Sequence, residues 1–288
     1  DRGVKGSVEL KELIDFMGSD KAEAKARTNS GEEIKLPPKT NSFKDWSESL
    51  IKYSNSETIL KEKDFWLKPA EEIIIPLQRD IFADNELNTV ESNDTVIIES
   101  DELKTQSLLK DVPKAFNTQI NDILLTALII AYNKLTNEYN LFINLEGHGR
   151  EEIFEGVDVS RTAGWFTSIY PVVLKLYDKN NIGETIKSTK EILREIPDSG
   201  IGFGVLKYLS NDNETKNQIK SIPYPEISFN YMGQFNENIS SDSAWKLGKD
   251  SIILSQNKSG IRPHLIEING IITGNKLKVY FNYSKNIH

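Results

Sequence analysis

The segment Ile120–Leu135 constrains the fold most, because it predicts a helix that is buried on more than one side. Its apolar residues recur with the 3.6-residue period of an α-helix, at Ile120, Ile123, Leu124, Ala127, Leu128, Ala131 and Leu135. The apolar stripe is widened by Leu125, Ile129 and Ile130. A short apolar strand is predicted directly afterwards, over Leu141–Leu145. We therefore expect this helix to pack against a sheet and against other helices.

The other predicted elements include both helices and strands, which is typical of a mixed sheet packed with helices. Strands are predicted over Thr95–Glu99, Trp165–Leu176 and Ile227–Phe235, and as a hairpin over Leu265–Ile272 and Leu277–Tyr283. Pro171 lies inside the second strand and indicates a sheet edge or a bulge. Helices are predicted over Val8–Phe16, from a Ser42 and Asp45 capping box onwards, over Glu57–Trp66, from Ser100 or Asp101 to Leu109, and over Ile182–Ile196. The fold class is therefore α/β.

Composition excludes several kinds of site. The 288 residues include no cysteine, which excludes disulfides, thiolate nucleophiles, zinc–thiolate sites and iron–sulfur clusters. Only three histidines are present, His148, His264 and His288, and they are too scattered to predict a metal site. An excess of 43 acidic over 35 basic residues argues against binding of nucleic acid.

The sequence also argues against a membrane protein. No apolar run approaches the ~20 residues that are needed to span a bilayer. The start, Asp1–Lys5, lacks the apolar region of a secretory signal, so we expect a cytoplasmic location. Because the chain begins with Asp1 rather than Met, we interpret it as a fragment of a longer protein.

The densest group of chemically active side chains is Glu146-Gly147-His148-Gly149-Arg150-Glu151. This segment follows the predicted strand Leu141–Leu145, and loops at strand ends often carry catalytic groups. Its glycines permit positive φ or the close approach of a ligand. The alternative is a polar turn with a surface ion pair. The scarcity of histidine in the chain favours a functional role.

The strand Ile227–Phe235 carries polar groups among apolar ones. In a strand, Asn230 and Met232 point to one face of the sheet and Tyr231 points to the other. A buried asparagine must be hydrogen-bonded. Asn230 therefore serves either the fold or a ligand, and the sequence leaves both options open.

Two further motifs have both a structural and a functional interpretation. Arg161 enters an apolar strand and needs an anionic or carbonyl partner, which is either a nearby acid of the protein or a substrate. The glycine-rich segment Pro197–Gly204 matches neither a P-loop nor a dinucleotide-binding pattern. We interpret it as a flexible loop that opens a helix at Val205.

Taken together, these motifs resemble the consecutive core motifs of epimerization domains of nonribosomal peptide synthetases. The matching segments, in order, are Asn121–Ala127, Glu146–Glu151, Arg161–Thr167, Pro197–Gly204, Phe229–Phe235 and Phe281–Asn286. The patterns Glu-Gly-His-Gly-Arg-Glu and Asn-Tyr-x-Gly-Gln favour epimerization over the related condensation domains. The resemblance covers roughly residues 95–288, and Leu36–Trp46 is also similar to the family.

The resemblance implies a chloramphenicol-acetyltransferase-like fold, with two similar α/β lobes and an active site between them. It implies inversion from L to D of an aminoacyl or peptidyl thioester, held on the phosphopantetheine arm of a peptidyl carrier protein domain. No cofactor is expected to bind directly. The expected partners are that carrier domain and either neighbouring synthetase domains or the missing first lobe.

The resemblance also assigns roles to individual residues. Glu146 is expected to transfer a proton, while Asn230 and Tyr231 are expected to donate hydrogen bonds to the enolate oxygen. His148, Arg161 and Gln234 are expected to contact substrate, with His148 and Arg161 mainly orienting the loop.

One departure from the family is clear. The family carries His-His-x-x-x-Asp-Gly in its first lobe, and this sequence has no adjacent histidine pair. We therefore predict an unassigned segment or linker over residues 1–40, a remnant of the first lobe and a crossing over 41–94, and the C-terminal lobe over 95–288. The chain alone is predicted to be inactive. A condensation-type domain that forms amide bonds and a non-catalytic carrier-docking module remain alternative interpretations.

Overall fold

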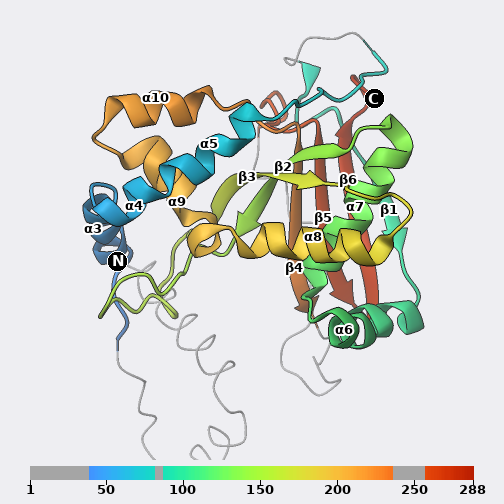
Figure 1. Cartoon of the computed structure of the whole chain (residues 1–288), viewed down its shortest axis with the longest axis horizontal. Helices are drawn as coiled ribbons and strands as arrows, with labels where there is room; N and C mark the ends of the chain where they lie inside the picture. The colour runs from blue at the N-terminus through green and yellow to red at the C-terminus, as the bar shows by residue number, and fades with distance from the viewer. Residues whose placement is uncertain (1–38, 82–86, 236–256) are drawn as a thin grey trace, which may run out of the picture. The chain divides into compact units, whose positions relative to one another are not determined.

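The computed structural model describes residues 39–81, 87–235 and 257–288 (Figure 1). The predicted helix Val8–Phe16 and the charged segment Lys21–Gly31 lie outside these residues. The α-helices are α3 (Phe43–Tyr53), α4 (Glu57–Lys61), α5 (Lys63–Glu71), α6 (Glu102–Phe116), α7 (Ile120–Thr136), α8 (Ile182–Arg194), α9 (Ile201–Gly204) and α10 (Asn213–Ser221). A 3₁₀ turn, η2 (Pro197–Gly200), precedes α9, and a π-helix, η3 (Val205–Leu209), follows it.

The described residues form two compact units. The smaller unit contains residues 39–50 and 152–166, and the larger unit contains the described residues of 51–151 and 167–288. The smaller unit is organised by aromatic contacts, since the ring of Trp46 lies 5.1 Å from that of Phe154 and 6.0 Å from that of Phe166. In the described part of the chain, no helix combines the length and the apolar character needed to cross a bilayer.

The larger unit is built on one six-stranded mixed sheet. Its strands are β1 (Asn93–Glu99), β2 (Asn140–Gly147), β3 (Ser168–Lys175), β4 (Ile227–Phe235), β5 (Ile266–Thr273) and β6 (Lys276–Ser284), in the spatial order β1-β6-β5-β4-β2-β3. Strand β4 runs parallel to both β2 and β5, and the other neighbours are antiparallel. The predicted mixed sheet packed with helices is confirmed. Pro171 lies in β3 at one edge of the sheet, as its missing N–H requires.

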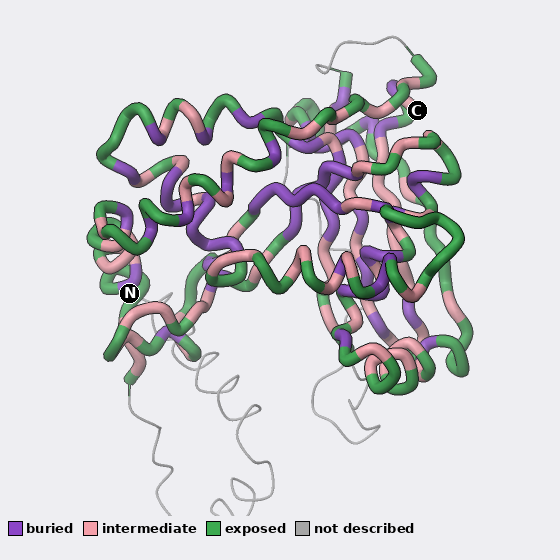
Figure 2. The backbone as a smooth tube through the Cα atoms, in the orientation of Figure 1, coloured by how far each residue is buried: buried purple, intermediate pink, exposed green. Residues whose placement is uncertain are grey.

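The two faces of the sheet differ in chemistry. Helix α7 covers the apolar face, where a methyl group added to Gly270 would lie 3.9 Å from Leu124. On the opposite face, which we call the polar face, a row of polar residues is aligned across strands β2, β4, β5, β6 and β1. These residues are Asn144, Ser228, Glu267, Asn282 and Thr95. Figure 2 shows burial concentrated in β2 and β3, whereas β1, at the opposite edge of the sheet, is largely exposed. The polar face is where side chains could do chemistry.

Local sequence signals account for the helix ends. Helix α7 begins at the predicted residue and is capped by the Gln119 N–H, which donates to Oδ2 of Asp122 at 2.8 Å. The predicted Ser42 and Asp45 capping box is also confirmed: the Ser42 N–H donates to the Asp45 carboxylate at 2.8 Å, and the Asp45 N–H donates to Ser42 Oγ at 3.1 Å. Helix α7 ends where Asn137 adopts a left-handed conformation.

Several predicted boundaries were wrong, and the helix predicted over Ile182–Ile196 ends two residues earlier, at Arg194. The helix predicted over Glu57–Trp66 is two helices, and the second continues through Pro69, because a proline near a C-terminus removes only one hydrogen bond. The helix predicted to end at Leu109 continues to Phe116 for the same reason, with Pro113 in its last turn. Strand β3 begins at Ser168 rather than at Trp165, since its partner β2 ends opposite Ser168.

Candidate functional site

A cavity of about 510 Å³ lies in the larger unit, where the parallel strands β2 and β4 end and helix α7 begins. The carboxyl ends of parallel strands are a common place for ligand sites in α/β sheets. The residues that line the cavity are Gln119, Asn121, Asp122, Leu125, Leu145, Glu146, Gly147, His148, Thr167, Tyr170, Leu193, Ile196, Ser199, Phe229, Asn230 and Tyr231.

Glu146 and Asn230 form the polar centre of this cavity. Leu145 of β2 is aligned with Phe229 of β4, so the two residues that follow them lie side by side on the polar face. Asn230 Nδ2 donates a hydrogen bond to Glu146 Oε2 at 2.8 Å. The sequence left open whether Asn230 serves the fold or a ligand. In the structure its side chain is bonded to Glu146, the residue that is expected to transfer a proton.

The pKa of Glu146 is raised above the usual value for glutamate. The main cause is burial of the carboxyl group by surrounding protein, and the negative charge of Glu267 contributes further. The residue nevertheless keeps access to solvent at the cavity. A carboxyl group with a raised pKa binds protons more readily, which suits both the removal and the return of a proton.

Tyr231 borders the same cavity from the apolar face. Its ring lies beside Gly270, where an added methyl group would come within 3.3 Å of it. The hydroxyl group is buried and has no hydrogen-bond partner among the described residues. Burial raises the pKa of this phenol, so it keeps its proton. A buried hydroxyl without a partner can donate to a ligand that enters the cavity.

His148 lies in the loop after β2 and contacts its own turn. The Arg150 N–H donates to His148 Nδ1 at 3.0 Å, which leaves the proton of the neutral imidazole on Nε2. That atom lies 3.4 Å from Glu151 Oε1. Both interpretations of this segment therefore have support, because Glu146 and His148 line the cavity while His148 also lies beside Glu151 in the turn.

The glycine-rich segment Pro197–Gly204 is a tight turn at the cavity wall followed by helix α9, so the helix predicted to begin at Val205 already begins at Ile201. Asp198 and Ser199 both adopt positive φ, at 41° and 51°, which is unfavourable for residues with a side chain. Gly200 follows at 87°, and a methyl group there would lie 1.9 Å from the ring of Tyr170. The flexible loop expected from the sequence is therefore held by close contacts, and it places Ser199 against the cavity.

Two of the predicted site residues are not among those that line this cavity. Arg161 belongs to the smaller unit, where the pKa of Asp158 is lowered first by hydrogen bonds from Ser160 and also by the Arg161 charge. Gln234 lies beyond a bulge at Gly233, where φ is 95° and the register of β4 shifts. It is exposed and does not line the cavity.

Sequence reasoning missed several residues that line the cavity. Asp122 lies in the first turn of α7, and its pKa is raised by burial, although the Gln119 N–H and nearby basic residues act in the opposite direction. Its capping role could have been recognised from the sequence. Tyr170 is buried opposite Leu145, and its pKa rises to about 12, mainly through burial and also through the charge of Glu151. No local pattern indicates that position.

Comparison with known proteins gives a consistent result. One of the linear gramicidin synthase proteins of Brevibacillus parabrevis is 42% identical over 90% of this chain, and bacitracin synthase 2 from Bacillus licheniformis is 38% identical over 88%. The chain spans only 3% and 10% of the lengths of these relatives. The epimerization domain from the third module of tyrocidine synthetase B superposes with a TM-score of 0.81 at 34% identity, over 95% of this chain and 60% of that one.

More distant structures share the fold alone. The condensation domain of the Monacolin K polyketide synthase superposes with a TM-score of 0.65 at 14% identity, over 92% of this chain and 60% of that one. The family model described as the condensation domain matches residues 17–288. The membership inferred from the motifs is confirmed: this chain belongs to the condensation domain family.

Proposed function

We propose that this chain provides the Glu146 side of an epimerization site, at which the α-carbon of an aminoacyl or peptidyl thioester is inverted from L to D. The observation that carries the proposal is the 2.8 Å hydrogen bond between Asn230 and Glu146 at a cavity of about 510 Å³. The 34% identity to an epimerization domain supports this reaction over condensation, because the first condensation domain of the CDA synthetase is only 10% identical.

In this proposal Glu146 exchanges a proton with the α-carbon. Its raised pKa makes the ionised carboxylate a stronger base than an ordinary glutamate and makes the protonated form readily available. Asn230 holds Oε2, which directs Oε1 toward the substrate. When the α proton leaves, negative charge develops on the thioester oxygen. The unpartnered hydroxyl of Tyr231 is the donor that we assign to that oxygen.

Inversion also requires a second group, which protonates the opposite face of the planar intermediate. In epimerization domains that group belongs to the motif His-His-x-x-x-Asp-Gly, which this sequence does not contain. We therefore expect no inversion of configuration by this chain alone. The substrate is proposed to arrive on the phosphopantetheine arm of a peptidyl carrier domain, so carrier and neighbouring synthetase domains are the proposed partners.

The test uses a fusion in which the first lobe of the tyrocidine synthetase B epimerization domain precedes this chain. Washout of the α proton of a carrier-bound aminoacyl thioester is followed in D₂O by mass spectrometry. Glu146→Gln should reduce the exchange rate at least ~100-fold, because general acid–base catalysis contributes on that order. Glu99→Gln, which removes a carboxylate from the same sheet face, should leave the rate unchanged.

Each alternative predicts a different result. Near-normal exchange by the Glu146→Gln fusion would place the proton-transfer group elsewhere. A longer amide product, formed only when an acceptor amine is supplied, would favour a condensation domain. Carrier binding without exchange by a folded fusion would favour a docking module. Inversion of configuration by the isolated chain would contradict the need for a second group.

A further inference from the structure

The polar face of the sheet carries a second carboxylate close to Glu146. Glu267 of β5 is aligned with Ser228 of β4, and Asn230 lies two residues further along the same strand on the same face. Glu146 and Glu267 therefore extend from the same face of the two strands that flank β4, and they are offset by two residues along those strands. Two carboxylates so placed influence each other's charge.

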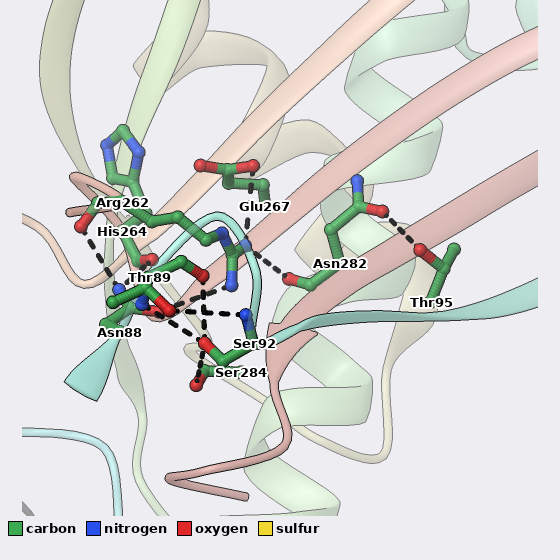
Figure 3. A network of polar contacts seen from close by, with 9 residues as sticks. All are labelled: Asn88, Thr89, Ser92, Thr95, Arg262, His264, Glu267, Asn282 and Ser284. Carbon is green, nitrogen blue, oxygen red and sulfur yellow. Dashed lines mark hydrogen bonds and ion pairs between the residues drawn. The ribbon is translucent and has the colours of Figure 1, made fainter. Parts of the chain in front are cut away.

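Glu267 is held in place by a buried arginine. Arg262 Nη2 lies 3.4 Å from Glu267 Oε2, and the Arg262 side chain is only 5% exposed. The guanidinium group also donates to Asn88 Oδ1 at 3.3 Å and to the Asn282 carbonyl oxygen at 3.1 Å. Figure 3 shows these groups converging on Arg262, with Glu267 on one side of the guanidinium group. The Glu267 carboxylate is therefore paired with a buried guanidinium group that is itself held by hydrogen bonds.

Besides Glu267, other ionisable side chains border the Glu146 cavity or the neighbouring strands. They are His148, Tyr170, Tyr231, Asp122 and Tyr224. After burial, the charge that raises the pKa of Glu146 is that of Glu267. The pKa of Tyr224 is raised first by burial and then by Tyr208, Glu267 and Glu146, although a hydrogen bond from Asn144 opposes this. The two carboxylates therefore act on a common neighbour.

We propose that Glu267 is a positioning residue for Glu146: its carboxylate, fixed by Arg262, repels the Glu146 charge across β4 and favours the protonated form of Glu146. The chemical purpose of this arrangement rests on the proposed function, because a carboxyl group that is easily protonated can both remove and return an α proton. Arg262 sets the strength of the effect, since its positive charge partly offsets that of Glu267.

The test is an NMR titration of the full chain, with glutamate labelled by ¹³C at the side-chain carboxyl carbon. Glu267→Gln keeps the side-chain shape but removes the charge, so the midpoint of the Glu146 titration should move to lower pH. Glu267→Asp retains the charge and should restore most of the original midpoint. Glu99→Gln is the matched control on the same sheet face and should leave the Glu146 midpoint unchanged.

The two Glu267 variants decide the proposal directly. An unchanged Glu146 midpoint in folded Glu267→Gln, or a Glu146 midpoint in Glu267→Asp as low as that in Glu267→Gln, would overturn the proposal. Equal shifts from Glu99→Gln and Glu267→Gln would also overturn it, since the effect would then be one of overall charge.

The titrations require no turnover, so their outcome is independent of the proposed function. In the active fusion, Glu267→Gln should retain exchange while the acid limb of the pH–rate profile moves to lower pH. Exchange that is lost in the unaltered fusion, with the titration shifts intact, would contradict the proposed function alone.

Discussion

The polar network around Arg262 and the polar groups at the Glu146 cavity lie in the same unit but differ in how completely their polar groups are hydrogen-bonded. Arg262 and Asn88 are both buried, and each makes several hydrogen bonds to side chains or backbone (Figure 3). At the cavity, Glu146 keeps access to solvent and the Tyr231 hydroxyl has no partner among the described residues. Buried polar groups are normally paired, so the unpaired group indicates a place for a ligand.

This difference indicates a structural role for the first region and a functional role for the second. Asn88 Nδ2 donates to the carbonyl oxygens of both Arg262 and His264, at 3.1 and 2.7 Å, and so ties the segment before β5 to the segment before β1. The two regions meet at Glu267, which pairs with Arg262 and also influences Glu146. The hydrogen-bonded network around Arg262 thus holds the Glu267 carboxylate, whose negative charge contributes to the raised pKa of Glu146 at the cavity.

The largest expected effect comes from breaking the satisfied network. Asn88→Ala would leave two buried carbonyl groups and part of the Arg262 guanidinium group without their partner. The free energy of unfolding should fall by about 4 kcal/mol, since several buried polar groups lose their hydrogen bonds at once. Urea denaturation followed by circular dichroism measures this change.

The control for that experiment is taken from the other region. Tyr231→Phe removes a hydroxyl group that has no partner among the described residues, so the free energy of unfolding should change by less than ~0.5 kcal/mol. A loss from Tyr231→Phe as large as that from Asn88→Ala would remove the distinction between the two regions.

A smaller effect concerns pH. His264 is buried, and its pKa is lowered to about 4, mainly by burial and also by the charge of Arg262. The unfolded chain binds this proton near pH 6.5. Stability from the neutral histidine is therefore complete above pH 6.5 and is lost as the pH falls from 6.5 to about 4. The expected loss is roughly 3 kcal/mol, at 1.36 kcal/mol for each pKa unit.

His264→Gln should flatten this dependence. The glutamine can still accept a hydrogen bond from Asn144 Nδ2, which lies 2.9 Å from His264 Nε2, but it does not titrate. Unfolding free energies measured at several values between pH 4 and 6.5 should decline less steeply in the variant. Identical slopes for both proteins would show that His264 is not the titrating group.

The elements that local patterns define were predicted well from the sequence. Helix α7 and the β5–β6 hairpin follow from hydrophobic periodicity and a turn signal. The order of the strands was not predictable in this way, because it depends on pairing between distant segments. Strand β4 lies between β2 and β5, and this order brings Asn230 of β4 beside Glu146 of β2.

The candidate site shows the same limit. Glu146, His148, Asn230 and Tyr231 were selected from motifs, and the structure places all four at one cavity. Ser199 was not selected, because its position depends on a turn with positive φ that its sequence disfavours.

The most direct test of the proposed epimerization is the fate of the α-carbon during turnover. The fusion described above is supplied separately with L- and D-aminoacyl thioesters on a carrier domain in D₂O, and the products are analysed for deuterium and configuration. We predict that both substrates reach the same mixture of L and D forms, with one α-deuteron incorporated in each inverted molecule. Inversion without deuterium, or amide formation with the configuration and the α proton retained, would contradict this mechanism.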